Sequence, residues 1–204
     1  MANTCFNSIR IVGPQEHLKK LRQLITDIAR IFETRNEDLM MYTLLKSLGY
    51  HDHDLYANPD ADYREEFRPD ALGGPLKLED GVLQLSTEST WNFHADSWAL
   101  VRQALPGIEI YYLAEEFMGD VFITNDTSRR FFKTKWFLDS EEVEPAYFND
   151  DCSLIEYVHD ECDSTVGTMD ELQAFLDEAD EQDRFYSLHE ITYDADARLA
   201  SIPF

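Results

Sequence analysis

An alternating segment that leads directly into an amphipathic segment limits the possible folds of this chain more than any other feature. Residues 5–13 read CFNSIRIVG, alternate apolar and polar side chains and end before Pro14. This pattern is typical of a half-buried strand. From Pro14 to Phe32, leucine and isoleucine recur at helical spacing, and proline suits the first turn of a helix. A strand and a helix that each have one apolar side must bury those sides together, so the sequence predicts helices layered on a sheet.

The same alternation of patterns continues along the chain. A second helix is expected from an Asn36 cap to Leu48, closed by Gly49. Residues 82–90 predict a strand, and residues 95–105 predict a helix that ends before Pro106. Three more strands are expected in close succession, at 108–114, 120–125 and 130–138. This order predicts an α+β sandwich, with a largely antiparallel sheet and helices on one face.

The predicted core spans residues 1–138, with a helical and loop insertion at about 34–80. Residues 50–80 hold three of the seven prolines and show no apolar period, so a long loop is expected there. Residues 139–204 are expected to form an acidic C-terminal extension packed on the core. Within it, we expect a strand at 153–159, a helix at 169–181 and a strand at 184–194.

Charge is the compositional outlier. The chain has 41 acidic and 17 basic residues, a formal net charge of −24. Residues 139–183 contain 17 Asp or Glu and neither Lys nor Arg. Such an asymmetry indicates the kind of partner a protein meets rather than its fold. The three cysteines fit no disulfide framework, and neither a signal peptide nor a membrane span is recognisable, so a cytoplasmic protein is expected.

Four segments resemble the YubB-type family found on plasmids, integrated elements and phages: MANTCFNSIRIVGP, STESTWNF, YLAEEFMGDVFITND and FFKTKWFLD. The residues that carry the resemblance are Asn3, Cys5, Asn7, Gly13, Trp91, Glu115, Glu116, Gly119, Asn125 and Asp126. The resemblance implies a ferredoxin-like fold without an iron–sulfur cluster and a mobile-element setting. It implies no enzymatic activity.

Residues 177–180 spell Asp-Glu-Ala-Asp, the letters of a helicase ATPase motif. That motif needs a phosphate-binding loop with a Gly-Lys pair, and the chain contains no such pair. Thr168 and Glu171 instead form a capping box before an amphipathic helix, so we exclude the helicase interpretation. The acids at the end of this helix oppose its dipole, either because they serve a partner or because a frayed end leaves them screened by solvent.

Candidate metal and thiol sites are sparse. His51 and His53 would share one side of an extended segment and could hold a metal, although a polar loop explains them better. His159 and Cys162 could contribute to a zinc site, or to a thiol–imidazole pair that nearby carboxylates would oppose. We expect no metal and no cofactor.

The remaining charged motifs have ordinary explanations. Glu115 and Glu116 are expected in a solvated turn. The basic segment 129–135, RRFFKTK, is expected to be a strand with one solvated face, and four bases cannot offset the net charge near a polyanion. Direct nucleic-acid binding is therefore not expected, nor is contact with a membrane.

The sequence predicts a non-enzymatic protein whose acidic surface binds a basic protein partner, such as a nuclease or another nucleic-acid-binding effector. One concrete form is a DNA mimic of the anti-restriction or anti-CRISPR kind. The predicted contact residues are Asp150, Asp151, Glu156, Asp160, Glu161, Asp170, Asp177, Glu178, Asp180, Glu181 and Asp183. Two alternatives stay open: an interaction domain whose charge only maintains solubility, and a small metal-dependent enzyme.

Overall fold

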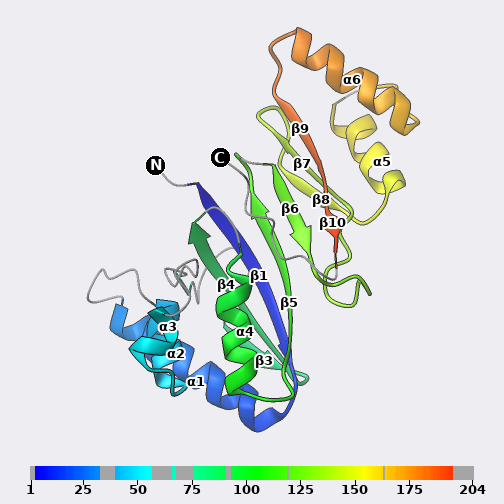
Figure 1. Cartoon of the computed structure of the whole chain (residues 1–204). Helices are drawn as coiled ribbons and strands as arrows, with labels where there is room; N and C mark the ends of the chain where they lie inside the picture. Colours follow the sequence, from blue (N-terminus) through cyan, green and yellow to red (C-terminus); the bar gives the residue numbers. More distant parts are fainter. Residues whose placement is uncertain are drawn as a thin grey trace. The chain divides into compact units, whose positions relative to one another are not determined.

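The structure is a computed structural model that describes residues 3–32, 40–56, 66–67, 76–90, 93–118, 120–162 and 164–194. The chain divides into two compact units (Figure 1). Unit 1 comprises Met1–Thr127 with Asp194–Phe204, and unit 2 comprises Ser128–Tyr193. Among the described helices, none is both long and apolar enough to cross a membrane.

Unit 1 combines one antiparallel sheet with helices, and the predicted α+β class is confirmed. Its elements are β1 (Thr4–Val12), α1 (Gln15–Phe32), α2 (Met40–Ser47), α3 (Asp52–Tyr56), β2 (Glu66–Phe67), β3 (Lys77–Glu79), β4 (Val82–Thr90), α4 (Ala95–Ala104), β5 (Glu109–Glu116) and β6 (Val121–Thr124). The strands lie in the order β6-β5-β1-β4-β2, and β3 also pairs with β4. Every one of these pairings is antiparallel.

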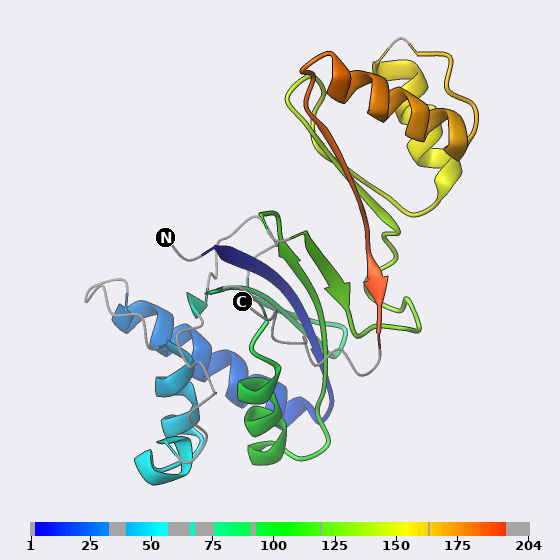
Figure 2. The same cartoon turned by 45° about the horizontal axis from the view of Figure 1, so that its top comes forward.

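The helices of unit 1 lie on one face of this sheet (Figure 2). In β1, alternate residues from Cys5 to Ile11 point into the core, as the sequence pattern predicts. Ile9 lies at the centre, opposite Leu85 of β4 and Tyr112 of β5. The apolar stripe of α1 and the ring of Trp98 on α4 belong to the same buried cluster. Burial of this one cluster therefore joins elements that are distant in the sequence.

Two side chains complete the sheet where backbone bonds end. The Asn125 amide oxygen accepts a hydrogen bond from the Tyr112 backbone N–H at 2.9 Å, and its NH₂ group donates to the carbonyl of Ile110 at 2.9 Å. The hydroxyl of Thr124 donates to the carbonyl of Tyr112 at 2.5 Å. These bonds continue the edge of β5 beyond the last residue of β6, so that buried backbone groups remain paired.

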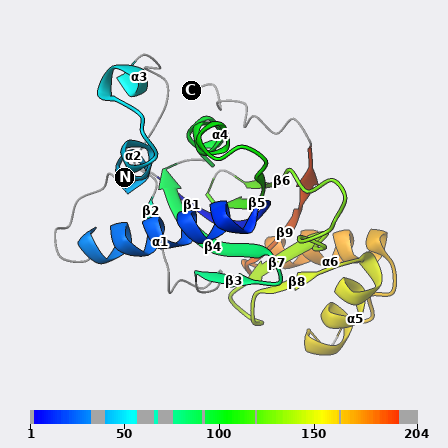
Figure 3. The same ribbon diagram turned by 90° about the horizontal axis from the view of Figure 1, so that it is seen from below.

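Unit 2 is a small sheet with two helices packed against it (Figure 3). Its elements are β7 (Trp136–Ser140), β8 (Ala146–Phe148), α5 (Asp151–Glu161), α6 (Met169–Glu181), β9 (Tyr186–Glu190) and β10 (Thr192–Tyr193). β7 lies between β8 and β9 and is antiparallel to both. The core between sheet and helices contains Leu138, Phe148, Leu154, Val158, Val166 and Leu172.

Three predictions about this part of the chain are wrong. The strand expected at 130–138 does not extend the core sheet, because β7 finds its partners in β8 and β9, both later in the sequence. The compact units consequently divide after Thr127 rather than after Leu138. The strand expected at 153–159 is part of α5, whose Asp150 cap accepts a hydrogen bond from the Ser153 backbone N–H at 2.8 Å.

Two further differences concern unit 1. The loop expected at 50–80 contains α3, β2 and β3. The second helix begins at Met40 among the described residues, and its expected Asn36 cap lies outside them.

Candidate partner-binding surface

Helix α6 begins at the predicted capping box. The hydroxyl of Thr168 accepts a hydrogen bond from the Glu171 backbone N–H at 3.2 Å, and the Glu171 carboxylate accepts one from the Gly167 backbone N–H at 2.9 Å. Both bonds pair backbone N–H groups that have no partner within the helix. They fix the first turn of α6, and with it the direction in which the acidic side chains of that turn project.

One side of α6 is apolar and the other is acidic. Leu172 and Ala179 are buried, and Phe175 and Leu176 pack beside them on the unit 2 core. At about 100° per residue, the acidic side chains occupy the arc opposite these residues. All six are exposed: Asp170, Glu171, Asp177, Glu178, Asp180 and Glu181. The acidic side chains therefore point into solvent from a helix whose other side packs on the core.

The C-terminal end of α6 is closed rather than frayed. The Arg184 backbone N–H donates to the carbonyl of Ala179 at 2.9 Å, and the Asp183 backbone N–H donates to the carbonyl of Asp180 at 3.1 Å. Asp183 has a φ of 57°, in the left-handed region. These bonds and this conformation form a Schellman motif, in which glycine is the usual residue at the left-handed position. The frayed end that sequence reasoning left open is not what the structure shows.

Helix α5 adds a second set of carboxylates. Leu154 and Val158 are buried, whereas Glu156, Asp160 and Glu161 are exposed. The Asp150 cap is exposed as well, and its hydrogen bonds from Ser153 lower the pKa of its carboxyl group. α5 and α6 pack on the same core and lie next to each other in unit 2 (Figure 3).

Asp151 has a different role from the other predicted contact residues. Its carboxylate accepts hydrogen bonds at 2.6 Å from the Lys135 ammonium and from the Trp136 indole N–H. The bond from Lys135, followed by that from Trp136, holds the pKa of Asp151 below its ordinary value. Asp151 thus ties the start of α5 to the start of β7. The other ten predicted contact residues are exposed.

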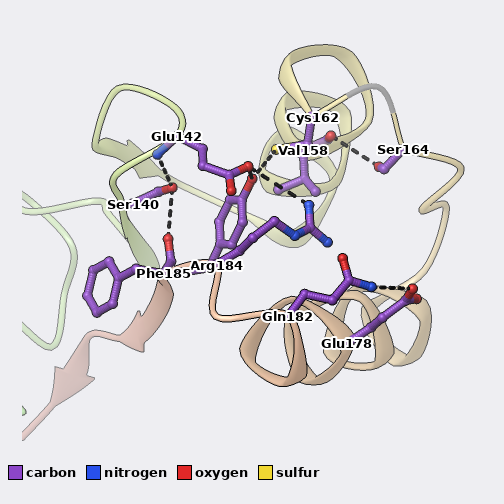
Figure 4. Close-up of polar contacts among 10 residues, drawn as sticks. Ser140, Glu142, Val158, Cys162, Ser164, Glu178, Gln182, Arg184 and Phe185 are labelled. Carbon is purple, nitrogen blue, oxygen red and sulfur yellow. Dashed lines mark hydrogen bonds and ion pairs between the residues drawn. The ribbon is translucent and has the colours of Figure 1, made fainter.

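Arg184, the basic residue that follows α6, is directed away from the exposed carboxylates of that helix (Figure 4). The Arg184 guanidinium lies 3.9 Å from the Glu142 carboxylate and 5.5 Å from the centre of the Phe175 ring. The Tyr186 hydroxyl donates to the same Glu142 carboxylate at 2.8 Å and lies 3.7 Å from the Cys162 sulfur. Burial raises the pKa of the Cys162 thiol, which opposes a role as a nucleophile.

The predicted contact set missed the outward carboxylate of Glu171. Sequence reasoning assigned Glu171 only to the capping box, although its position three residues after the cap also places it on the outward arc of α6. Its carboxylate does both, because it accepts from Gly167 and is exposed. The helical period that identified the other acids contains this signal too.

The candidate metal ligands are dispersed. Within the described part of the chain, no three His, Cys, Asp or Glu side chains are placed to hold a metal ion. His51 and His53 do not lie on an extended segment, because Asp52 begins α3; their rings stack with centres 5.7 Å apart, and His53 lies 3.1 Å from Asp54. His159 is exposed at the end of α5, where Cys162 is half-buried.

Several residues of the family resemblance have structural positions in unit 1. The Asn7 NH₂ group donates to Thr87 at 3.1 Å and to Ser89 at 2.8 Å, and the Cys5 thiol donates to its amide oxygen at 3.3 Å. Glu115 and Glu116 are 7% and 2% exposed on β5, so the solvated turn expected for them is wrong. The turn begins two residues later than predicted because β5 continues through Glu116 to pair with β6.

No protein-family model matches this chain, and searches of curated proteins and of solved structures also find no match.

Proposed function

We propose that this protein is a non-enzymatic binding protein that engages a basic partner through the exposed carboxylates of α5 and α6. We call this surface the acidic face. It consists of Asp150, Glu156, Asp160, Glu161, Asp170, Glu171, Asp177, Glu178, Asp180, Glu181 and Asp183.

The closed end of α6 carries this proposal. Asp180 and Glu181 lie in its last turn, where the helix dipole favours cations by roughly 0.3–1 kcal/mol per charge. Asp183 takes the left-handed position, where glycine is the usual residue, although Asp80 and Asp120 also adopt this conformation. Three acids are thus placed where a cation or a glycine would suit the helix end better. Departures from local rules are expected at functional or strained sites, and the proposal interprets this end of α6 as a functional one.

Ordered carboxylates suit the imitation of nucleic acid. Duplex DNA presents one negative charge per ~1.7 Å of its axis, and the proteins that bind it carry basic grooves. Asp170, Asp177 and Glu181 follow one line along α6, with axial separations of about 10 Å and 6 Å at ~1.5 Å per residue. Because the core holds α6, these charges need no ordering when the partner binds. A decoy for a restriction or RNA-guided nuclease is the specific form that we propose.

We further infer that unit 1 is a ferredoxin-like domain related to the YubB-type family. The strand order β5-β1-β4-β3, with antiparallel neighbours throughout, supports this inference. So does the placement of α1 after β1 and of α4 between β4 and β5. A mobile-element origin follows from the same relationship, and a decoy for a nuclease is consistent with that origin.

Binding of purified nucleases tests the function. The protein is immobilised and exposed to a panel of restriction and RNA-guided nucleases at low ionic strength, with duplex DNA as competitor. We expect at least one nuclease to be retained, to be released by salt and to be displaced by DNA. The quadruple variant Asp177→Lys, Glu178→Lys, Asp180→Lys and Glu181→Lys should lose this binding.

A matched variant controls for net charge. Glu16, Glu79, Asp96 and Glu109 are exposed acids of unit 1, and their replacement by lysine changes the net charge by the same amount. This variant should retain the nuclease. Equal loss in both variants would assign the binding to overall charge. If none of the nucleases binds, the proposed function is wrong and the negative charge serves solubility alone.

A further inference from the structure

Unit 2 carries a short basic segment that the proposed function does not use. Arg129, Arg130 and Lys133 precede β7 and are all exposed. We call these three residues the basic loop. Within the described part of the chain, no carboxylate forms a salt bridge with any of them. In a chain with 41 acidic and 17 basic residues, three neighbouring cations without an acidic partner are a distinct surface feature.

The basic loop is held in place by its neighbours. The Tyr193 hydroxyl donates a hydrogen bond to the carbonyl of Phe132 at 2.9 Å. The Arg129 guanidinium lies 4.5 Å from the centre of the Tyr193 ring, and the Arg130 guanidinium lies 4.8 Å from the centre of the Phe131 ring. A guanidinium that stacks on a ring keeps the N–H groups at its edge available for carboxylates.

The basic loop and the end of α6 lie at opposite ends of the unit 2 sheet. The loop precedes Trp136, the first residue of β7, which pairs with Glu190 of β9. The last residue of β7, Ser140, pairs with Tyr186, which closely follows α6 in the sequence. β7 spans about 13 Å at ~3.3 Å per residue, so the basic loop does not reach the last turns of α6 within one copy.

The carboxylates in the last turns of α6 keep their negative charge. Asp177 and Glu178 accept hydrogen bonds at 2.8 Å and 2.9 Å from glutamine side chains, which are uncharged. Asp180 and Glu181 are exposed. None of these four carboxylates forms a salt bridge among the residues that the structure describes. One copy therefore displays both an ordered cationic surface and an ordered anionic surface, each without a partner of opposite charge.

We propose that the basic loop of one copy binds the end of α6 of a second copy, so that the protein self-associates. The two surfaces are complementary in charge and cannot pair within one copy. Because they are different surfaces, the contact is head-to-tail and adds copies into a chain or a closed ring. This inference rests on the acidic face of the proposed function, and it adds that a second copy competes with the partner for that face.

Salt affects this contact in a specific way. Two copies with a net charge of −24 each repel one another at long range. The Debye length falls from about 30 Å at 0.01 M salt to about 8 Å at 0.15 M and about 3 Å at 1 M. At 0.15 M, the long-range repulsion is screened while direct ion pairs persist. We therefore expect sedimentation velocity to show self-association of the full chain at 0.15 M salt, and its loss at 1 M.

Two charge-reversed variants test which surfaces meet. The loop variant is Arg129→Glu, Arg130→Glu and Lys133→Glu, and the second is the lysine variant of α6. Each variant alone should self-associate about tenfold more weakly or less, because like charges then meet. An equimolar mixture of the two should associate as the natural protein does, since the glutamate loop of one complements the lysine helix of the other. Association of the mixture also shows that both variants are folded.

A matched variant controls for the change in net charge. Lys19, Lys20 and Arg22 are exposed on α1, and their replacement by glutamate should leave self-association intact. The proposal is overturned if the natural protein stays monomeric at 0.15 M salt, if association persists at 1 M, if the α1 variant loses as much as the loop variant, or if the mixture does not associate. A single-stranded oligonucleotide that binds the natural protein but not the loop variant would assign the loop to nucleic acid and also overturn the proposal. No nuclease takes part, so this failure is distinct from a failure of the proposed function.

Discussion

The backbone N–H of Arg184 donates a 2.9 Å hydrogen bond to the carbonyl of Ala179, and this bond closes α6 around a left-handed Asp183. Glycine would satisfy the same bonds without steric cost, and an uncharged residue there would not oppose the helix dipole. Asp183 thus adds a negative charge to the end of α6 at a position where glycine would stabilise unit 2 more.

Replacement of Asp183 by glycine should therefore stabilise unit 2 and weaken partner binding. We expect the free energy of unfolding to rise by roughly 1 kcal/mol, because the left-handed conformation no longer carries a side chain. Urea denaturation measures this gain. Gly49→Ala is the converse control, since its φ of 107° should make alanine destabilising. A loss of stability in Asp183→Gly would show that the carboxylate itself contributes to the fold.

The bond between Tyr186 and Glu142 links β9 to the segment after β7. Phenylalanine at position 186 removes the 2.8 Å bond to Glu142 and the 3.7 Å contact with Cys162. We expect unit 2 to lose about 1 kcal/mol in its free energy of unfolding. Tyr111→Phe is a matched control, because the Tyr111 hydroxyl donates to Glu109 at 2.9 Å at an exposed position. Similar losses in the two variants would contradict a special role for the Tyr186 hydroxyl, which also makes the partly buried contact with Cys162.

Asp151 should make unit 2 sensitive to acid. The bonds from Lys135 and Trp136 hold the pKa of Asp151 below its ordinary value, so the folded protein favours the charged form. Its contribution is fully present above the unfolded pKa of about 3.9 and is lost as pH falls through the folded pKa. Asp151→Asn should lower the unfolding free energy at neutral pH, and its difference from the natural protein should shrink in acid. Glu156→Gln, at an exposed position of the same helix, should show no such pH dependence.

Tyr112 should produce the opposite dependence at alkaline pH. Burial, followed by the charges of Asp194 and Cys5, raises the pKa of Tyr112 to about 12. Its contribution to stability is complete below the unfolded pKa of about 10 and is lost as pH rises towards 12. In a spectrophotometric titration, Tyr112 should be among the tyrosines that ionise late, together with Tyr186, whose pKa burial also raises, and Tyr112→Phe should reduce the late absorbance change by one tyrosine. A titration unaffected by this change would contradict the prediction.

Gly13 should tolerate no side chain. A Cβ atom there would lie 2.7 Å from the carbonyl oxygen of Gly107 and 2.9 Å from the Cα atom of Ile108. Both are backbone atoms, so the segment that follows β1 and the segment that precedes β5 would have to move apart. We expect Gly13→Ala to cost about 1–3 kcal/mol in thermal or urea unfolding. Gly81→Ala, where no atom lies within 4 Å, should cost less.

Local patterns predicted the elements whose signals lie within a few residues. The strand expected at 82–90 is β4, and the helix expected at 169–181 is α6 with its Thr168 cap. Alternation and helical spacing identify such elements because each element must bury one side. The outward acids of α6 follow from the same spacing. Residues 153–159 failed this reasoning because a short apolar run fits either period, and the Asp150 cap decided for helix.

The sequence alone determined an α+β chain with one acidic helix of defined length and two apolar-faced strands near its beginning and middle. Only the tertiary structure decided which sheet β7 joins, that Glu115 and Glu116 are buried, and that Arg184 is directed towards Glu142. Each of these depends on residues far apart in the sequence. Periodicity records which side of an element is buried, but the partner that buries it is selected by the packing of the whole chain.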